Sequence, residues 1–490
     1  MNILKNKSSL FLIILLLGLA GVDVFLGKMI WDLRKKLELA VPEVFVVEEY
    51  RPANIVVNAG ASLGKIKPFW KGFAQGGEEM GGSMLASTVP AMKQISPSYV
   101  RLDHIFDDDY YGVVKGPGQY DFSKLDAEVD RILAMGAKPF FSLGYMPSAL
   151  ADSKISVPHD WGQWGSLVAA TVAHYSGEGG KNLSGVYYEV WNEPDLESFG
   201  AWKRGGEKSY LTMYSVSARA AMGVSNANHF YFGGPATTAL YRNWVIDLIN
   251  FCVKNKLKLD FISWHRYSFS PNQFLKDIQD TYKWLGANRD YYDWIITEWG
   301  PTPEKSGTYG SRYAAAHAFA TVRRLLGLGD LLFAFEVKDG PEQGDMGWGV
   351  LAHDSAGLYK KPRYYAFSWL NMLAGAERLS LRGEGTRVSG IATGGKENSS
   401  VFLTNFDSKG SNTEKVPIKV VGMPRGQYKV TKKFLFSKAG GEEIVNSKAG
   451  EVKTEISLAA NDVAWVNVEF LNKVEGGDTG GMSGFGELIE

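Results

Sequence analysis

Two glutamates follow apolar, β-rich runs of the sequence and could act as a pair. Glu193 comes directly after "VYYEVWN" and before a proline, and Glu298 lies near the end of "DWIITEWG". Two facing carboxyl groups can cleave a glycosidic bond, because one donates a proton to the leaving oxygen while the other, ionised, attacks the sugar or activates water. This chemistry requires that the two runs be strands whose ends meet.

These runs belong to a longer pattern in which β-rich runs alternate with helical segments over about 310 residues. The alternation predicts an α/β fold, a (β/α)8 TIM barrel. A doubly wound open sheet is the competing architecture, but no glycine-rich phosphate turn follows the first run. The eight β-rich runs are FWKGFAQ, SYVRLDHIF, KPFFSLGYM, VYYEVWNE, FYFGGPA, DFISWHRYS, DWIITEWG and LLFAFEVKD.

In such a barrel, catalytic side chains lie at the C-terminal ends of the strands. The fourth run ends in Asn192 and Glu193, the sixth carries His265 and Tyr267, and the seventh carries Glu298. The fourth and seventh strands are well separated around the ring, so their ends face each other across the barrel mouth. Plainer interpretations exist: Glu193 as a helix N-terminal charge, Glu298 as a strand-end acid and His265 as a core histidine.

Three further residues lie near these strand ends. Arg101, in "YVRLD", either bonds Glu298 or pairs with an aspartate, and the sequence leaves both open. Trp299 is either a wall residue or a stacking surface for a sugar ring. Glu189 has the same strand parity as Glu193, which predicts a local bulge or a buried salt bridge.

Residues 1–30 predict a signal anchor, a transmembrane or signal segment. Lys5 and Lys7 precede an apolar run from Leu10 to Val22, which is long enough for a signal-peptide core. Positive residues after the run, between Lys28 and Lys36, instead favour a cytoplasmic location for the part of the chain that follows. We therefore expect a membrane-anchored protein with an extracytoplasmic main domain, or a secreted protein if the segment is cleaved, and the orientation stays open.

The other boundaries follow from changes in composition. After residue 375 the helical segments stop, and strands with Gly, Ser, Asn and Asp turns predict an accessory β-sandwich. The glycine-rich end of the chain indicates disorder. The predicted domains are the anchor (1–30), a stalk with leading strands (31–58), the barrel (59–375), the β-sandwich (376–472) and a disordered tail (473–490).

Charge and composition exclude several classes of function. Lys and Arg together number 53, as do Asp and Glu, so the formal charge is zero. This balance argues against bulk attraction to nucleic acid, and no nucleic-acid partner is expected. The single cysteine, Cys252, allows no intramolecular disulfide. Neither a His/Cys ligand cluster nor a phosphate loop is present, so we expect no metal and no other cofactor.

Several blocks of the sequence, in order, resemble glycoside hydrolase family 39 of clan A. They are "YDFSKLDAEVDRILAMGAKPFFSLGYMPSALA", "EVWNEPDL", "GGPA", "DFIS.H.Y", "ITEW" and "GLYKKPRYYAF", within Phe69 to Gly375. The resemblance implies a (β/α)8 barrel and an oligo- or polysaccharide substrate. Members of that family hydrolyse β-xylosides, iduronides or other exopolysaccharide linkages with retention of configuration.

The resemblance also implies roles for individual residues. Glu193 matches the general acid/base of the family and Glu298 its nucleophile. Asn192 matches the asparagine that bonds the sugar 2-hydroxyl. His265 and Tyr267 match a pair near the nucleophile, where a neutral donor would orient Glu298 and keep it ionised.

The chain departs from the family pattern at positions expected to line the substrate subsites. Ser142 replaces a glutamate, Asp103 replaces a histidine, and the eighth strand offers Phe333 and Glu336 where tryptophan is frequent. Simple β-xylosidase specificity is therefore in question, and cutting inside a polysaccharide is equally compatible. The alternatives to a retaining hydrolase are a carbohydrate-binding protein on an inactive hydrolase scaffold and a transglycosylase.

Overall fold

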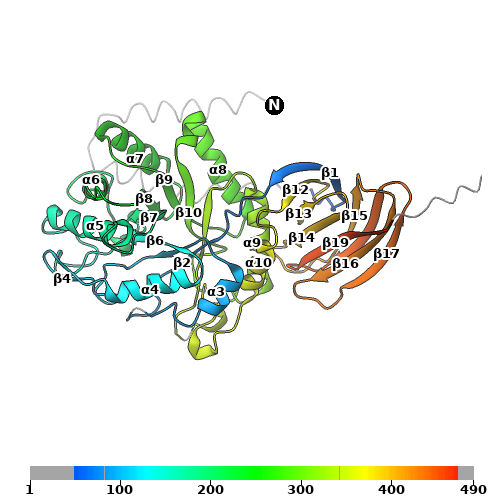
Figure 1. Cartoon of the computed structure of the whole chain (residues 1–490), viewed down its shortest axis with the longest axis horizontal. Helices are drawn as coiled ribbons and strands as arrows, with labels where there is room; N and C mark the ends of the chain where they lie inside the picture. Colours follow the sequence, from blue (N-terminus) through cyan, green and yellow to red (C-terminus); the bar gives the residue numbers. More distant parts are fainter. Residues whose placement is uncertain (1–48, 82, 342, 473–490) are drawn as a thin grey trace, which may run out of the picture. The chain divides into compact units, whose positions relative to one another are not determined.

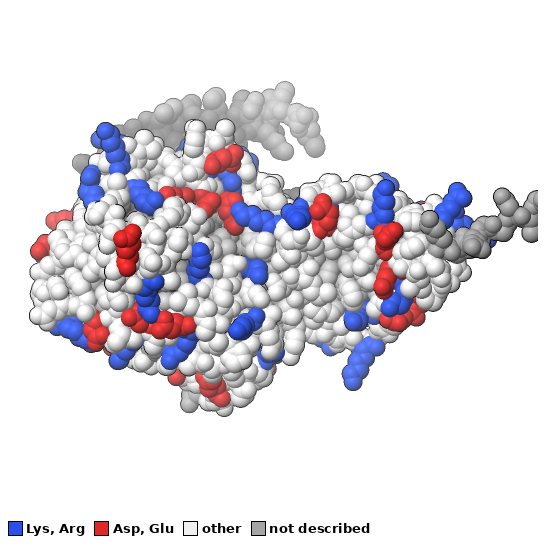
Figure 2. Space-filling view, in the orientation of Figure 1, with Lys and Arg blue, Asp and Glu red and all other residues white. Residues whose placement is uncertain are grey.

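The computed structural model describes residues 49–472, apart from residues 82 and 342. The predicted anchor, nearly all of the predicted stalk and the predicted tail lie outside these residues. Among the described residues, no helix has both the length and the apolar character needed to cross a membrane. On the face shown in Figure 2, basic and acidic side chains are interspersed, as the balanced composition predicts.

The larger domain is a closed barrel of eight parallel strands in the order β10-β11-β2-β3-β6-β7-β8-β9 (Figure 1). Each strand corresponds to one of the eight predicted runs, so the barrel prediction is confirmed. The strands are β2 (Gly72–Gln75), β3 (Tyr99–Leu102), β6 (Lys138–Leu143), β7 (Val186–Val190), β8 (Phe230–Thr237), β9 (Phe261–Tyr267), β10 (Asp293–Gly300) and β11 (Leu331–Phe335).

An α-helix follows every barrel strand, and a short hairpin of β4 (Val114–Gly116) and β5 (Gln119–Tyr120) precedes the second helix. Local signals start several of these helices: Asp160 caps α5 and Ser209 caps α6, each accepting a hydrogen bond from a first-turn N–H. The helices are α3 (Val89–Ile95), α4 (Ser123–Ala134), α5 (Trp161–Ser176), α6 (Tyr210–Met222), α7 (Arg242–Asn255), α8 (Pro271–Leu285), α9 (Arg312–Leu325) and α10 (Pro362–Asn371).

The barrel strands separate two apolar cores. Side chains that alternate toward the interior include Phe140 of β6 and Phe333 of β11, whose ring centroids lie 4.7 Å apart. Because β6 and β11 are not neighbours in the barrel, this contact crosses its interior. The intervening residues, such as Phe141 and Leu332, face outward and pack in the core shared with the helices. Because aromatic side chains fill the barrel interior, the polar residues at the C-terminal ends of the strands form the floor of the barrel mouth.

The second domain is a mixed sheet of nine strands in the order β17-β16-β19-β14-β13-β12-β1-β15-β18. Thr454 of β18 hydrogen-bonds Glu443 of β17, so the two edge strands of this sheet approach each other. The strands are β1 (Ile55–Lys65), β12 (Glu377–Arg382), β13 (Val388–Gly394), β14 (Asn398–Asn405), β15 (Glu414–Val421), β16 (Gly426–Phe434), β17 (Gly441–Ser447), β18 (Glu451–Leu458) and β19 (Val463–Asn472).

This architecture corrects one boundary and refines one expectation. A separate β-domain is confirmed, but hydrogen bonds join all of its strands into one sheet rather than the two sheets of the predicted sandwich. The predicted start of the barrel at residue 59 falls inside β1, which pairs with β12 and β15 of the second domain. The barrel itself begins at β2, since pairing partners more than 300 residues away decide where β1 belongs.

Candidate active site

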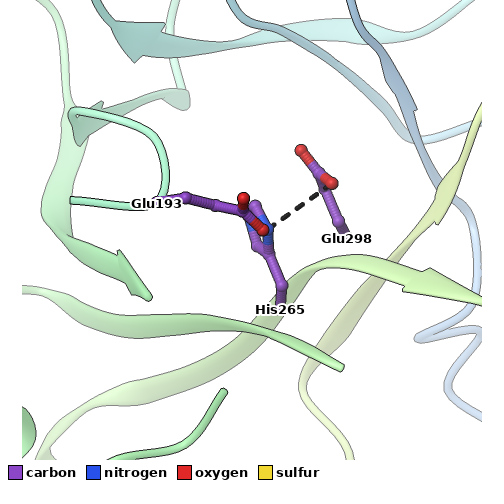
Figure 3. Close-up of side chains that lie close together, drawn as sticks. All are labelled: Glu193, His265 and Glu298. Atoms are coloured by element: carbon purple, nitrogen blue, oxygen red, sulfur yellow. Dashed lines mark hydrogen bonds and ion pairs between the residues drawn. The ribbon is translucent and has the colours of Figure 1, made fainter. Parts of the chain in front are cut away.

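The candidate site lies at the C-terminal ends of β7, β9 and β10, where Glu193, His265 and Glu298 point toward one another (Figure 3). His265 Nδ1 lies 2.7 Å from Glu193 Oε1 and 3.4 Å from Glu298 Oε2. One oxygen of each carboxyl group and one ring nitrogen of His265 all lie within 4.8 Å of one another. The structure therefore brings the two predicted glutamates together across the barrel mouth.

Glu298 reaches the site because β10 contains an irregularity of the β-bulge type. Ile295 faces the barrel interior and Ile296 the outer core, so strict alternation would turn Glu298 outward. The register with β9 shifts between Ile296 and Glu298, which leaves Thr297 as an extra residue. Glu298 consequently turns inward, and Trp299 turns outward.

A second break in alternation positions Glu193. The strand β7 ends at Val190, and the next side chain, Trp191, also packs in the outer core. Both Trp191 and Glu193 have left-handed backbone conformations, with φ of 69° and 45°, which are costly for residues with large side chains. Trp191 Nε1 donates to the Phe199 carbonyl (2.9 Å) and Glu193 N donates to the Ala236 carbonyl (3.0 Å), and these bonds hold the turn.

Arg101 of β3 connects the parts of the site through three hydrogen bonds. Its Nε donates to Glu189 Oε2 (2.7 Å), its Nη1 to Glu298 Oε1 (2.9 Å) and its Nη2 to Asn192 Oδ1 (2.7 Å). Arg101 and Glu189 are fully buried. Of the two partners left open for Arg101, the bond to Glu298 is observed. For Glu189 the structure shows both a buried salt bridge and, before Glu193, a break in the strand alternation.

Tyr267 and His265 divide their contacts between the two glutamates. The Tyr267 hydroxyl donates to Glu298 Oε2 (2.9 Å), as expected, whereas His265 lies closer to Glu193 than to Glu298. Burial raises the pKa of Glu298, against the opposing charges of His265 and Arg101. Burial by itself would lower the pKa of His265, but Glu298 and the contact with Glu193 outweigh burial and raise it.

Two of the predicted substrate-binding residues are not on the surface of the mouth. Trp299 is fully buried and packs edge-on against Phe274 and Phe367, so neither face of its ring is open to a sugar. The stacking interpretation is therefore wrong, and Trp299 is a wall residue. The outward turn that follows the bulge explains this position. Glu336 is also fully buried, and its Oε2 accepts a hydrogen bond from Gln75 Nε2 (2.8 Å).

The sequence pattern does not identify Tyr145, which belongs to the site. Its hydroxyl accepts a hydrogen bond from Asn192 Nδ2 (2.9 Å), and its ring packs edge-on against Trp191 at 5.0 Å. Tyr145 thus supports both the amide beside Glu193 and the turn that carries it. Its only sequence signal is its place near the end of the third predicted run, KPFFSLGYM, two residues beyond the observed end of β6.

Glu193, His265 and Glu298 also have the spacing of a metal-ligand group. Two carboxylates and one imidazole would suit several divalent ions. Their present partners are protein donors, however: Arg101 and Tyr267 already bond both oxygens of Glu298. We therefore interpret the group as a pair of carboxyl groups oriented by a histidine.

Comparison with known proteins adds independent information. The sequence matches glycosyl hydrolases family 39 over residues 53–319, more than half of the chain. It is 31% identical to the β-xylosidase of Geobacillus stearothermophilus over 224 residues, which are 42% of this chain and 44% of that protein. For the β-xylosidase of Caldicellulosiruptor saccharolyticus the identity is 30% over 244 residues, 45% of this chain and 47% of the relative. The matched region thus covers less than half of either relative.

Solved structures resemble the fold over a longer span. A monomeric β-xylosidase from Caulobacter crescentus CB15 superposes with a TM-score of 0.71 at 21% identity, covering 86% of this chain and all of that one. The bacterial orthologue of human α-L-iduronidase gives a TM-score of 0.64 at 15% identity, covering 87% of this chain and 84% of the other. At these identities the likeness concerns the fold. The family match over residues 53–319 shows that the chain belongs to glycoside hydrolase family 39.

Proposed function

We propose that this protein is a retaining glycoside hydrolase in which Glu298 is the nucleophile and Glu193 the general acid/base. The observation that carries the proposal is the closeness of the two carboxyl groups, whose nearest oxygens lie within 4.8 Å. Retaining enzymes place their carboxyl groups ~5–5.5 Å apart, whereas inverting enzymes need ~6.5–9.5 Å to admit a water molecule. Family membership and the two β-xylosidase relatives support the same reaction class.

In the first step, an oxygen of ionised Glu298 attacks the anomeric carbon while the bond to the leaving oxygen breaks. Glu193 donates its proton to that oxygen, which leaves as an alcohol, and the sugar is held as an ester of Glu298. Arg101 and Tyr267 donate to the two oxygens of Glu298 in the free protein, which orients the carboxylate for attack.

In the second step, Glu193 acts as a base. It removes a proton from water as the water oxygen attacks the anomeric carbon, the ester bond breaks, and Glu298 is released as a carboxylate. His265, in contact with both carboxyl groups, compensates their charge through the cycle. Attack by a sugar hydroxyl instead of water would give transglycosylation from the same intermediate.

Asn192 is placed to bind the sugar 2-hydroxyl. Its Oδ1 accepts from Arg101 and one of its amide hydrogens is donated to Tyr145. An amide carries two N–H donors, so the second is left for the substrate. The contact strengthens as charge develops on the sugar ring, which adds to transition-state stabilisation.

The test is release of sugar from a panel of aryl β-glycosides and bacterial and plant polysaccharides by the full chain, beside Glu298→Gln. We expect release by the wild type and a loss of at least about 10⁴-fold in the variant, since the nucleophile is removed while the fold is kept. Full activity of Glu298→Gln would contradict the assignment. No release by either protein, with measurable glycan binding, would indicate the binding-scaffold alternative.

We further propose that residues 1–30 anchor the protein in a membrane with the barrel outside the cytoplasm, on the strength of their apolar run. External protease added to intact cells is then expected to release the barrel. Complete protection would instead support a cytoplasmic orientation.

A further inference from the structure

A fully buried arginine in the first turn of α10 has no acidic partner. Arg363 is closed to solvent, it forms no ion pair with any of the described residues, and its Nε has no hydrogen-bond partner among them. Burial lowers the pKa of Arg363 to about 10, so the side chain is still a cation at neutral pH. Buried charges are ordinarily paired, because removing a charge from water is costly. The position of this charge therefore has another explanation than an ion pair.

The guanidinium group of Arg363 binds two backbone carbonyl groups instead of a carboxylate. Its Nη1 donates to the Phe335 carbonyl (2.7 Å) and its Nη2 to the Trp299 carbonyl (3.0 Å). The same group lies over the Trp299 ring, with Cζ 4.7 Å from the ring centroid. Hydrogen bonds from a charged donor are stronger than those between neutral groups, and the planar fork of an arginine holds two acceptors at once. Arg363 therefore joins the C-terminal ends of β10 and β11 and holds Trp299 by both its backbone and its ring.

The residue held by Arg363 lies where β10 departs from regular strand geometry. The register with β9 shifts between Ile296 and Glu298, and the register with β11 shifts between Ile296 and Trp299. A bulge disrupts the regular hydrogen bonds of a strand, so the strand ladder alone defines the direction of Glu298 less firmly. Neighbouring side chains of a strand point to opposite faces, so fixing Trp299 outward turns Glu298 inward. The contacts of Arg363 thus bear on the direction of Glu298.

A second buried arginine has the acidic partner that Arg363 lacks. Arg289 precedes β10 and is 5% exposed, and its Nη2 lies 3.2 Å from Asp330 Oδ2. Its guanidinium group also lies over a tryptophan of β10, with Cζ 5.6 Å from the centroid of the Trp294 ring. Two buried arginines therefore pack on tryptophans near opposite ends of the same strand. Of these two, the one without a carboxylate among the described residues is the one beside the candidate site.

We propose that Arg363 is a positioning residue for the nucleophile: by holding Trp299 through its carbonyl and its ring, it fixes the inward direction of Glu298 in the bulge of β10. This inference rests on the proposed function, in which Glu298 attacks the anomeric carbon. It goes further by adding a residue that acts on the reaction only through its neighbours. A small displacement of the attacking oxygen slows the chemical step without removing a contact to the sugar. Loss of Arg363 should therefore lower kcat and leave KM unchanged.

The experiment measures kcat and KM separately. The full chain, Arg363→Lys and Arg363→Met are assayed on the aryl β-glycoside that the wild type cleaves fastest. Lysine keeps the charge but cannot bridge two carbonyl groups, and methionine removes both the charge and the donors. We expect kcat to fall about 10-fold in Arg363→Lys and about 100-fold in Arg363→Met, with KM unchanged in both.

Arg289→Lys and Arg289→Met are the matched controls. They alter a buried arginine with a similar tryptophan contact near the other end of β10, so they should lower the melting temperature and leave kcat unchanged. If Arg363→Met does not fold, Arg363→Lys carries the test, because its aliphatic stem keeps most of the packing. Crystal structures of the wild type and Arg363→Lys add a measurement that needs no turnover. In the variant, Glu298 should be displaced from Arg101 or from Tyr267.

Three outcomes would overturn the inference: an unchanged kcat in folded Arg363→Lys, a rise in KM instead of a fall in kcat, or an equal loss of kcat in Arg289→Lys. Failure of the proposed function is distinguishable from these. Turnover that depends on Glu298 but not on Arg363 would keep the hydrolase and refute the positioning role. No turnover by the wild type, with Glu298 displaced in the structure of Arg363→Lys, would do the reverse. No turnover and no displacement would refute both.

Discussion

At the scale of single residues, Glu193 acts as an acid in one step and as a base in the other, and one substitution can separate the two roles. As an acid it matters most for substrates with poor leaving groups, and as a base it matters for every substrate. Glu193→Ala is expected to lose about 10²–10⁴-fold in kcat/KM on such substrates. Added azide, a nucleophile that needs no base, should restore part of the rate on activated aryl glycosides and give a glycosyl azide detectable by mass spectrometry. Uniform loss without azide rescue would contradict the acid/base role.

Tyr267 allows a prediction about pH. Glu298 must be ionised to attack, and burial raises its pKa above the ordinary 4.5, so kcat/KM should fall with acidification already above pH 4.5. The Tyr267 hydroxyl bonds the ionised carboxylate, so Tyr267→Phe removes support for that form and moves the acidic limb to still higher pH. Profiles of kcat/KM against pH for both proteins provide the check. A limb that moves to lower pH in the variant would be inconsistent with this account.

At the scale of elements, the Arg101–Glu189 pair ties β3 to β7 while Arg101 also reaches β10 through Glu298. Glu189→Ala would leave a buried guanidinium short of one counter-charge, a change that costs about 3–5 kcal/mol in the free energy of unfolding. Glu189→Gln keeps an acceptor for Arg101 Nε and should cost less. Urea denaturation of the two variants measures the difference.

An exposed ion pair serves as the control for this prediction. Lys415 and Glu455 of the second domain lie 2.8 Å apart with most of both side chains in solvent. Because solvent screens such pairs, Glu455→Ala should change stability far less than Glu189→Ala. Equal effects of the two substitutions would show that the buried pair does not join the strands as described.

At the scale of the whole molecule, β1 precedes the barrel in the sequence but belongs to the β-domain, whose other strands all follow the barrel. It lies between β12 and β15, and its Ile55 and Val57 are buried in the core of that domain. A chain that begins at residue 66 would split the sheet and expose this core, so its melting temperature should drop and the β-domain should become sensitive to protease. A chain that begins at residue 49 is expected to melt like the full chain. Equal melting of the two truncated chains would contradict a structural role for β1.

The sequence by itself determined the order of the barrel strands, because alternating β-rich and helical runs are local patterns that each segment carries alone. It also placed Glu193 and Glu298 at the ends of opposed strands, since the barrel puts strand ends on one face. The sequence predicted that Arg101 pairs with a carboxyl group but did not choose between Glu298 and an aspartate.

Only the tertiary structure decided which way these side chains turn and what they touch. The extra residue Thr297 and the left-handed turn at Trp191 reverse the alternation that a sequence reading assumes. The same reversal buried Trp299, which the sequence could equally have assigned to a sugar platform. The pairing of β1 depends on partners far along the chain, and no local pattern encodes the register or packing that brings such partners together.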